Sequence, residues 1–289
     1  MRLFYYIWGV TAILLVVVLY LAIVQGNRYL FQPWISPTEW AIEKKLAHES
    51  KSLEDLNFSL RDPNQAPPHI RDQILFGYHI LLNTPKAVPQ YAGDTLSCTN
   101  CHFAAGDTSG GKNGGISLAG VAAKYPLFNP KTQTTMDLPA RINNCFERSL
   151  NGKPLPVESK EMLAIVSYLN WISKGFPSHV TVPWLGLKKL NSTHEGDATQ
   201  GEKIYQAQCA LCHGNNGEGE PQHSIPPIWG EHAYNDGAGM NVSETLAAFI
   251  YLNMPYTDAS LSEEEAIDVS AYISQQPRPS YKKPTGSNL

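Results

Sequence analysis

Cys98-Thr99-Asn100-Cys101-His102 and Cys209-Ala210-Leu211-Cys212-His213 are two copies of one pattern, C-x-x-C-H, and this pattern decides the fold. Two thiols at this spacing each form a thioether with one vinyl group of a single haem, and the adjacent imidazole reaches one axial face of the iron. The copies begin 111 residues apart and use four of the five cysteines. Paired zinc or redox C-x-x-C sites do not explain the histidine after each pair. We therefore predict two covalently bound haem c groups.

Cys145 is the cysteine left over, and its spacing from the first motif suggests a role for it. It follows His102 by 43 positions, whereas Met254 follows His213 by 41 positions. The two halves look like repeats of one unit, with Cys145 where the second half has Met254. Because sulfur binds haem iron, we predict the ligand pairs His102–Cys145 and His213–Met254. A Cys145 that only packs in the core is the alternative.

Other methionines and histidines compete for these roles. Met240, 27 positions after His213, is the rival ligand of the second haem, and Met136 is the rival of the first. Met162 lies on the apolar face of a predicted helix and is expected in the core. His79 lies among apolar helix residues and is expected to pack in the core rather than bind metal.

The first segment of the chain is apolar. Leu3–Val24 has 22 residues without a formal charge, enough for a helix that spans the hydrocarbon core of a bilayer. We favour an uncleaved anchor over a signal peptide, because the apolar run is long and Ala22-Ile23-Val24-Gln25 is a poor cleavage site. Haem is attached in this way outside the bacterial cytoplasm. We therefore expect a single-pass protein of the bacterial inner membrane with its haem domains in the periplasm.

Length and charge set the broad class. A chain of 289 residues is long enough for two compact domains, and a net charge of −4 without a basic run argues against a nucleic-acid partner. Apolar periodicity and capping signals predict a mostly α fold with two cytochrome c-like haem domains in tandem after the transmembrane helix. The predicted domains are 1–26 (anchor), 27–180 (first haem) and 181–289 (second haem).

Helices are predicted over 36–56, 69–82, 158–173, 197–208, 242–252 and 262–274, the last with a capping box of Ser262 and Glu265. Residues 103–140 are rich in Gly, Pro, Asn and Thr and are expected to be mostly loop around the porphyrin. No strand pattern competes with the helices.

The chain resembles the di-haem thiosulfate dehydrogenases of the TsdA type over about residues 68–275. The specific part is the segment Arg141-Ile142-Asn143-Asn144-Cys145-Phe146-Glu147-Arg148-Ser149, followed by Asn151-Gly152-Lys153. Tyr234-Asn235-Asp236-Gly237-Ala238-Gly239-Met240 and Asn253-Met254-Pro255 also match the family, whereas the haem motifs alone fit many unrelated cytochromes.

The resemblance implies an enzyme that couples two thiosulfates into tetrathionate and passes two electrons on. In this family the His/Cys haem is catalytic and the cysteine sulfur takes part, which assigns that role to Cys145. Arg141 and Ser149 match positions that line the substrate site. Some members have Lys before the methionine ligand and exchange ligands on reduction, whereas this chain has Asn253, so we expect no such switch. The implied acceptor is a cytochrome c or a membrane respiratory complex.

Physical chemistry supports these assignments. Thiosulfate is a small dianion, which Arg141 can bind through charge-assisted hydrogen bonds. On one regular helix Arg141, Cys145 and Ser149 share a face. Arg148 is a weaker candidate for substrate contact, and both arginines could instead pair with haem propionates. A thiolate ligand stabilises ferric iron more than a methionine does, so electrons should pass from the first haem to the second.

Three other functions stay open from the sequence. The first is a membrane-anchored di-haem electron carrier, such as a respiratory complex subunit, without substrate chemistry. The second is an enzyme that conjugates thiosulfate to a carrier protein. The third is the same site working in reverse as a tetrathionate reductase.

Overall fold

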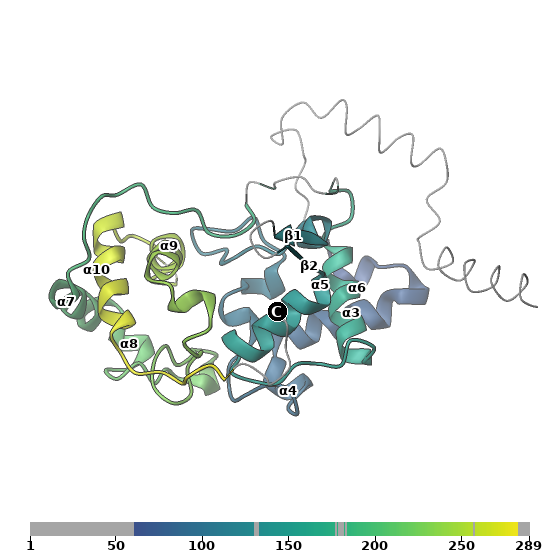
Figure 1. Cartoon of the computed structure of the whole chain (residues 1–289), viewed down its shortest axis with the longest axis horizontal. Helices are drawn as coiled ribbons and strands as arrows, with labels where there is room; N and C mark the ends of the chain where they lie inside the picture. Colours follow the sequence, from purple (N-terminus) through teal and green to yellow (C-terminus); the bar gives the residue numbers. More distant parts are fainter. Residues whose placement is uncertain are drawn as a thin grey trace, which may run out of the picture. The chain divides into compact units, whose positions relative to one another are not determined.

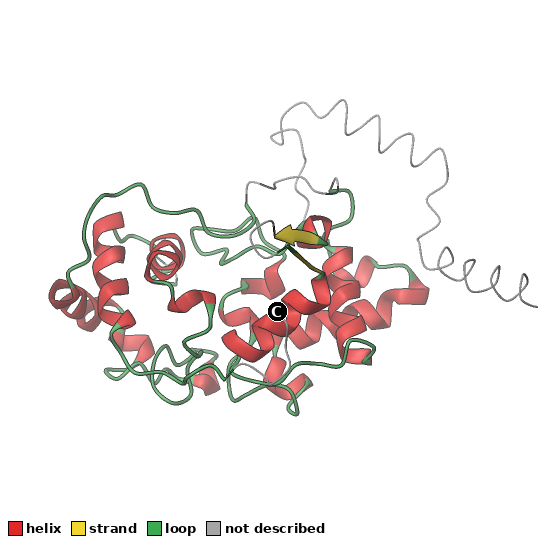
Figure 2. Ribbon diagram, viewed as in Figure 1, coloured by secondary structure: helices red, strands yellow, loops and turns green. Residues whose placement is uncertain are grey.

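The computed structural model describes residues 61–129, 133–176, 178, 182, 184–256 and 258–282. This part of the chain is mostly helical, as the sequence predicts (Figures 1 and 2). Its α-helices are α3 (Pro68–Leu82), α4 (Thr84–Ala87), α5 (Leu138–Asn144), α6 (Lys160–Trp171), α7 (Ala198–Gln208), α8 (Ala210–His213), α9 (Ser243–Asn253) and α10 (Glu263–Ser274). The short helical turns are η2 (Pro63–Gln65), η3 (Cys98–Asn100), η4 (Phe103–Gly106), η5 (Val121–Lys124), η6 (Cys145–Ser149), η7 (Pro221–His223) and η8 (Gly239–Asn241).

Two predictions lie outside the described residues, namely the anchor over Leu3–Val24 and the helix over 36–56. Within the described ranges, no helix combines the length and the hydropathy that a bilayer crossing requires.

Two separate hydrophobic cores organise the helices. The first contains buried side chains from Ala66 to Ile172, and the second contains buried side chains from Tyr205 to Ile273. We call the elements from α3 to α6 the N-terminal domain and those from α7 to α10 the C-terminal domain. The boundaries assigned from the sequence, at 26 and 180, stay predictions.

Helices α3 and α6 form the centre of the N-terminal domain. They approach so closely that a Cβ on Gly77 would lie 2.1 Å from the carbonyl oxygen of Ala164. Met162 on α6 is fully buried, which confirms its predicted place in the core. His79 on α3 is exposed, so the expectation that it packs in the core is wrong. Its neighbour Ile80 is on the buried face instead.

Helix α10 packs against α7 and α9 in the C-terminal domain. Here too a glycine permits close contact, since a Cβ on Gly201 would lie 1.9 Å from the carbonyl oxygen of Asp268. The predicted capping box is confirmed: the Ser262 hydroxyl accepts from the Glu265 N–H, and the Glu265 carboxylate accepts from the Ser262 N–H. The two domains therefore repeat one packing device, a helix crossing at glycine.

The long loop before α5 contains one feature that the sequence does not predict. Strands β1 (Leu127–Asn129) and β2 (Thr134–Met136) pair as a short antiparallel hairpin. The expectation of no strand is wrong in this detail. Each strand has only three residues and is largely exposed, so the alternation of apolar and polar residues that reveals a strand is missing.

Candidate functional site

The first C-x-x-C-H motif begins a tight turn that presents its imidazole. Ser97 and Asn100 form a capping box around η3, and the Thr84 hydroxyl donates to the Cys98 sulfur at 3.3 Å. The Nδ1 atom of His102 lies 2.8 Å from the carbonyl oxygen of Ile116. A carbonyl partner requires Nδ1 to carry the proton, which leaves Nε2 as the free atom for a metal.

Burial sets the protonation states of this motif. Desolvation raises the pKa of both Cys98 and Cys101 to about 12, and it lowers the pKa of His102 to about 4. The imidazole is therefore neutral near pH 7, which is the form that binds iron. The hydrogen bond that the His102 Nδ1–H donates to the Ile116 carbonyl opposes this shift without cancelling it.

Cys145 and Arg141 lie close to the first motif. Asp137 caps α5 by accepting from the Ala140 N–H, and one turn later the Arg141 Nη1 atom donates to the Cys145 sulfur at 2.8 Å. The charge of Cys145 raises the pKa of Arg141 and of both motif thiols, and the charge of Arg141 lowers the pKa of His102. The fold thus gathers two thiols, an imidazole, a third sulfur and a guanidinium in one place.

The helix that carries Cys145 is not regular. Helix α5 ends at Asn144, and η6 (Cys145–Ser149) is a π-helical turn closed by a hydrogen bond from the Leu150 N–H to the Cys145 carbonyl at 3.0 Å. The argument that Arg141, Cys145 and Ser149 share a face assumes one regular helix, and the π turn interrupts that helix before Ser149. Among the described contacts, no hydrogen bond joins the Ser149 hydroxyl to Arg141 or Cys145. Such π turns often mark functional sites, because they change the direction of a side chain.

Arg148 faces the C-terminal domain. Its guanidinium lies over the ring of Tyr281 at 5.0 Å, and its buried Nε atom has no hydrogen-bond partner among the described residues. A buried donor of this kind is expected to have an acceptor. An anionic acceptor such as a haem propionate or thiosulfate would supply it.

Two tyrosines lie beside this cluster, Tyr125 near Arg141 and Tyr234 near Cys101, and sequence reasoning missed both. Tyr125 lies within hydrogen-bond reach of Arg141. Burial raises the pKa of Tyr234, from the C-terminal domain, and the charge of nearby Cys101 adds to this rise. The Arg278 guanidinium lies over the Tyr234 ring at 4.5 Å. Loop residues from distant segments give no local signal, although Tyr234 falls in a segment that matches the family.

The second C-x-x-C-H motif is built in the same way. The Nδ1 atom of His213 lies 3.2 Å from the carbonyl oxygen of Pro226, and burial lowers the pKa of His213. Burial also raises the pKa of Cys209 to about 11, whereas Cys212 is exposed. Free Nε2 and two adjacent thiols again match the needs of a covalently bound haem.

Met254 is placed at the end of α9, where the helix stops and the backbone turns extended. It packs against the second core together with Cys209, whereas Met240 is buried on η8 outside that core. The rival for the first haem, Met136, lies on β2, where its sulfur accepts a long contact of 3.7 Å from the Asn144 amide. This arrangement favours Met254, and all ligand assignments stay predictions.

The donor set of each domain fits a haem c. Cys98, Cys101 and His102 would hold the first, with Cys145 as the second axial ligand. Cys209, Cys212, His213 and Met254 would hold the second. In both domains the histidine is neutral and its Nδ1 atom is occupied, which is what a proximal ligand requires.

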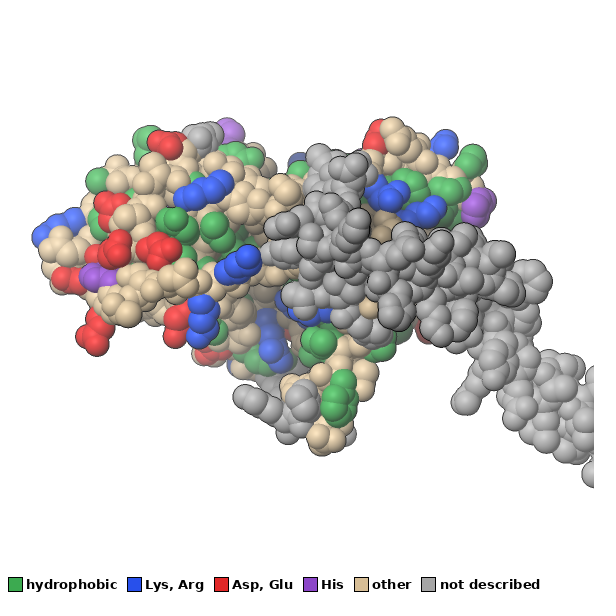
Figure 3. All heavy atoms as spheres, turned by 90° about the horizontal axis from the view of Figure 1, so that it is seen from above, with side chains coloured by type: hydrophobic (Ala, Val, Ile, Leu, Met, Phe, Trp, Pro, Cys, Tyr) green, Lys and Arg blue, Asp and Glu red, His purple; other side chains and the backbone are tan. Residues whose placement is uncertain are grey.

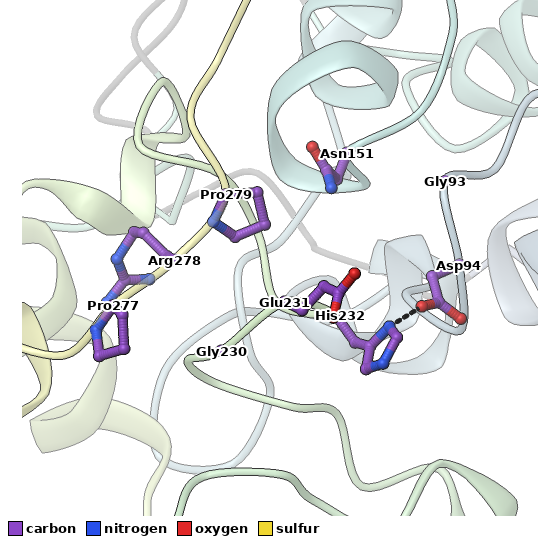
Figure 4. Close-up of a pocket in the computed structure, with 9 residues that line it drawn as sticks. All are labelled: Gly93, Asp94, Asn151, Gly230, Glu231, His232, Pro277, Arg278 and Pro279. Carbon is purple, nitrogen blue, oxygen red and sulfur yellow. Dashed lines mark hydrogen bonds and ion pairs between the residues drawn. The ribbon is translucent and has the colours of Figure 1, made fainter.

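A pocket of about 570 Å³ lies where the two domains meet (Figure 4). Its lining includes Asp94 and Asn151 from one side and Glu231, His232 and Arg278 from the other. The His232 imidazole is hydrogen-bonded to the Asp94 carboxylate, so one side-chain contact joins the domains across the pocket. None of the predicted site residues lines this pocket.

Comparisons with known proteins agree with this two-part site. Residues 90–178 match the family model described as SoxA/TsdA, cytochrome c domain, and residues 196–273 match that of cytochrome C oxidase, cbb3-type, subunit III. A thiosulfate dehydrogenase of Allochromatium vinosum is 36% identical over 220 residues, which covers 74% of this chain and 82% of that protein. A thiosulfate dehydrogenase of Thiomonas intermedia is 39% identical over 219 residues, covering 74% and 68%.

A solved structure has the same fold. The thiosulfate dehydrogenase (TsdBA) of Marichromatium purpuratum superposes with a TM-score of 0.72 at 29% identity, covering 79% of this chain. This chain spans about half of that longer chain, 51% of its length.

Proposed function

The chain belongs to the thiosulfate dehydrogenase family of di-haem cytochromes c, and from that premise we propose that it joins two thiosulfate ions into tetrathionate at Cys145. The overall reaction converts two S₂O₃²⁻ into one S₄O₆²⁻ and two electrons, and no proton is exchanged. The observation that carries this proposal is the 2.8 Å contact between the Arg141 guanidinium and the Cys145 sulfur beside the first haem motif.

The bound haems supply iron that accepts and passes on single electrons. The residues of the chain do the rest. Arg141 offers a planar, permanently charged donor fork to the dianion and neutralises part of its charge near Cys145. Tyr125 and Cys145 hold that guanidinium in position. The Arg141 side chain is therefore already oriented when the substrate binds.

The sulfur chemistry balances at Cys145. The thiolate and the outer sulfur of one thiosulfate form an S–S bond, which gives Cys–S–S–SO₃⁻ and releases two electrons to an external acceptor. The outer sulfur of a second thiosulfate then attacks the sulfur bonded to Cys145, so that tetrathionate forms and the Cys145 thiolate leaves. The same two steps in reverse reduce tetrathionate.

We further propose that the acceptor is a basic cytochrome c or a membrane respiratory complex. Acidic side chains gather on the face of the C-terminal domain that Figure 3 shows. The first turn of α10 in this domain contains three more acidic residues, Glu263, Glu264 and Glu265. Such a surface steers a positively charged partner toward the second haem. The apolar segment Leu3–Val24 supports a membrane anchor that leaves the haem domains in the periplasm.

An electron carrier without substrate chemistry is not favoured, because four matched relatives are named thiosulfate dehydrogenase. The test compares the oxidised wild-type protein with Cys145→Gly. We expect thiosulfate to reduce the haems of the wild type only, as followed by absorbance, while dithionite reduces the haems of both. Reduction of Cys145→Gly by thiosulfate at the wild-type rate would refute the role of Cys145.

A further inference from the structure

The last turn of α9 ends at the predicted iron ligand of the second haem, and it is capped by the other domain. An α-helix leaves its final carbonyl groups without partners inside the helix. Here the Lys112 ammonium donates to the Tyr251 carbonyl at 2.7 Å, and the Asn113 N–H donates to the Leu252 carbonyl at 3.1 Å. The Asn113 amide donates to the Asn253 carbonyl at 3.1 Å.

All three donors come from one loop of the N-terminal domain, Gly111–Ile116, which we call the clamp loop. It also binds the chain beyond the helix. Lys112 donates to the Ala259 carbonyl at 3.0 Å, and the Asn113 amide contacts the carbonyls of Pro255 and Tyr256. The clamp loop thus holds both sides of Met254. The Lys112 ammonium also lies at the C-terminal, negative end of the α9 dipole, where a cation is stabilising.

Asn253 is the buried centre of this contact. Its side chain has no exposed surface, and its Oδ1 atom accepts from the Gly115 N–H at 2.8 Å. Its Nδ2 atom donates back to the Phe249 carbonyl at 3.2 Å. Both polar ends of the amide are satisfied, one inside α9 and one in the clamp loop. An apolar residue here would leave the buried Gly115 N–H without an acceptor.

The same loop also touches the first haem motif. The Ile116 N–H donates to the Cys101 carbonyl at 2.9 Å, and the Ile116 carbonyl is the partner of His102 Nδ1 at 2.8 Å. A Cβ on Gly115 would lie 2.8 Å from the Cys101 carbonyl oxygen, so the loop packs directly on the motif backbone. One short segment therefore fixes the imidazole of the first motif and the helix end before Met254.

We propose that the clamp loop and Asn253 are positioning elements that hold Met254 on the iron of the second haem, so that this bond depends on the N-terminal domain. The inference rests on the proposed assignment of Met254 as ligand. It predicts that substitutions in the clamp loop, which belongs to the N-terminal domain, weaken the bond between Met254 and the iron of the second haem. Gly115 and Asn253 carry the buried part of the contact, and Lys112 carries the exposed part.

The experiment titrates the oxidised, full-length holoprotein with imidazole, which competes with methionine for ferric haem. The readout is the absorbance band of methionine-bound ferric haem. We expect Asn253→Ala to lower the half-displacing imidazole concentration about tenfold, the effect of one lost buried hydrogen-bond partner. Asn113→Ala removes half-buried hydrogen bonds and should lower it in the same direction. Lys112→Met should lower it about two- to fivefold, since it removes a charge at a helix end.

Matched controls are Asn191→Ala and Lys188→Met, which change exposed residues of the connecting segment and should leave the midpoint unaltered. Lys112 is exposed at the surface, so its variant keeps the test valid if Asn253→Ala does not fold. The inference is overturned if Asn253→Ala, Asn113→Ala and Lys112→Met all have the wild-type midpoint. If the wild type lacks the methionine band, or Met254→Gly retains it, the ligand assignment fails and the inference with it. The role of Cys145 would stand in either case.

Discussion

Replacement of Gly77 by alanine should separate the two helices at the centre of the N-terminal domain. The added Cβ would lie 2.1 Å from the Ala164 carbonyl oxygen, 2.6 Å from its carbon and 2.9 Å from the Tyr168 Cβ. Ordinary van der Waals contact begins near 3.4 Å, so α3 and α6 must move apart by more than an ångström. A carbonyl group cannot rotate away as a flexible side chain can.

Overpacking of a tight core costs about 1–3 kcal/mol, and the backbone neighbour places Gly77→Ala at the upper end, about 3 kcal/mol. If the described residues unfold as one unit, this lowers the midpoint of thermal unfolding by about 6–12 °C. Circular dichroism of the oxidised holoprotein measures it. A variant that retains wild-type haem content but melts at the lower temperature agrees with the reasoning.

The matched control is Gly239→Ala, because a Cβ there meets nothing within 4 Å. Its stability should stay within about 0.5 kcal/mol of wild type, as for surface substitutions in general. Gly201→Ala should behave like Gly77→Ala, since its Cβ would lie 1.9 Å from the Asp268 carbonyl oxygen. The reasoning is refuted if Gly77→Ala and Gly239→Ala melt at the same temperature.

Three further changes probe other parts of the chain. Arg141→Gln removes the charged donor to Cys145 and should lower kcat/KM for thiosulfate about 10- to 100-fold in steady-state assays, with Arg141→Lys recovering part of it. Ser262→Ala loses the N-cap of α10 and should cost about 1 kcal/mol in chemical denaturation, whereas a cost near zero would contradict the cap. Burial raises the pKa of Asp107, so the ionised Asp107 carboxylate destabilises the folded state once the pH rises through that pKa. The stability of Asp107→Asn should therefore increase relative to wild type as the pH rises, which melting at a series of pH values measures.

Local signals made most helices predictable. The helix expected over 69–82 is observed as α3 (Pro68–Leu82), because prolines and an apolar stripe mark its start and its buried face. The expected end of the last helix, at residue 274, agrees with α10 (Glu263–Ser274), whose capping box is written in the sequence. Such features depend only on residues within one or two turns of one another.

Parts of the site depend on contacts that the sequence does not display. The Arg141–Cys145 contact followed from i, i+4 spacing, but the π turn after it did not, because no residue type specifies a π turn. The approach of Tyr234 to Cys101 needs two domains to meet. Sequence periodicity describes one helix at a time, so it does not predict contacts between residues that are far apart in the chain.

The capping of α9 by Lys112 and Asn113 bears on how far this protein is modular. A C-terminal domain transplanted onto another cytochrome would arrive without the donors for its last helical turn. Exchange of one domain between relatives is therefore expected to succeed only when the partner brings a compatible loop. The two halves, although built on one plan, are therefore not interchangeable units, because the second relies on a loop of the first for its helix end.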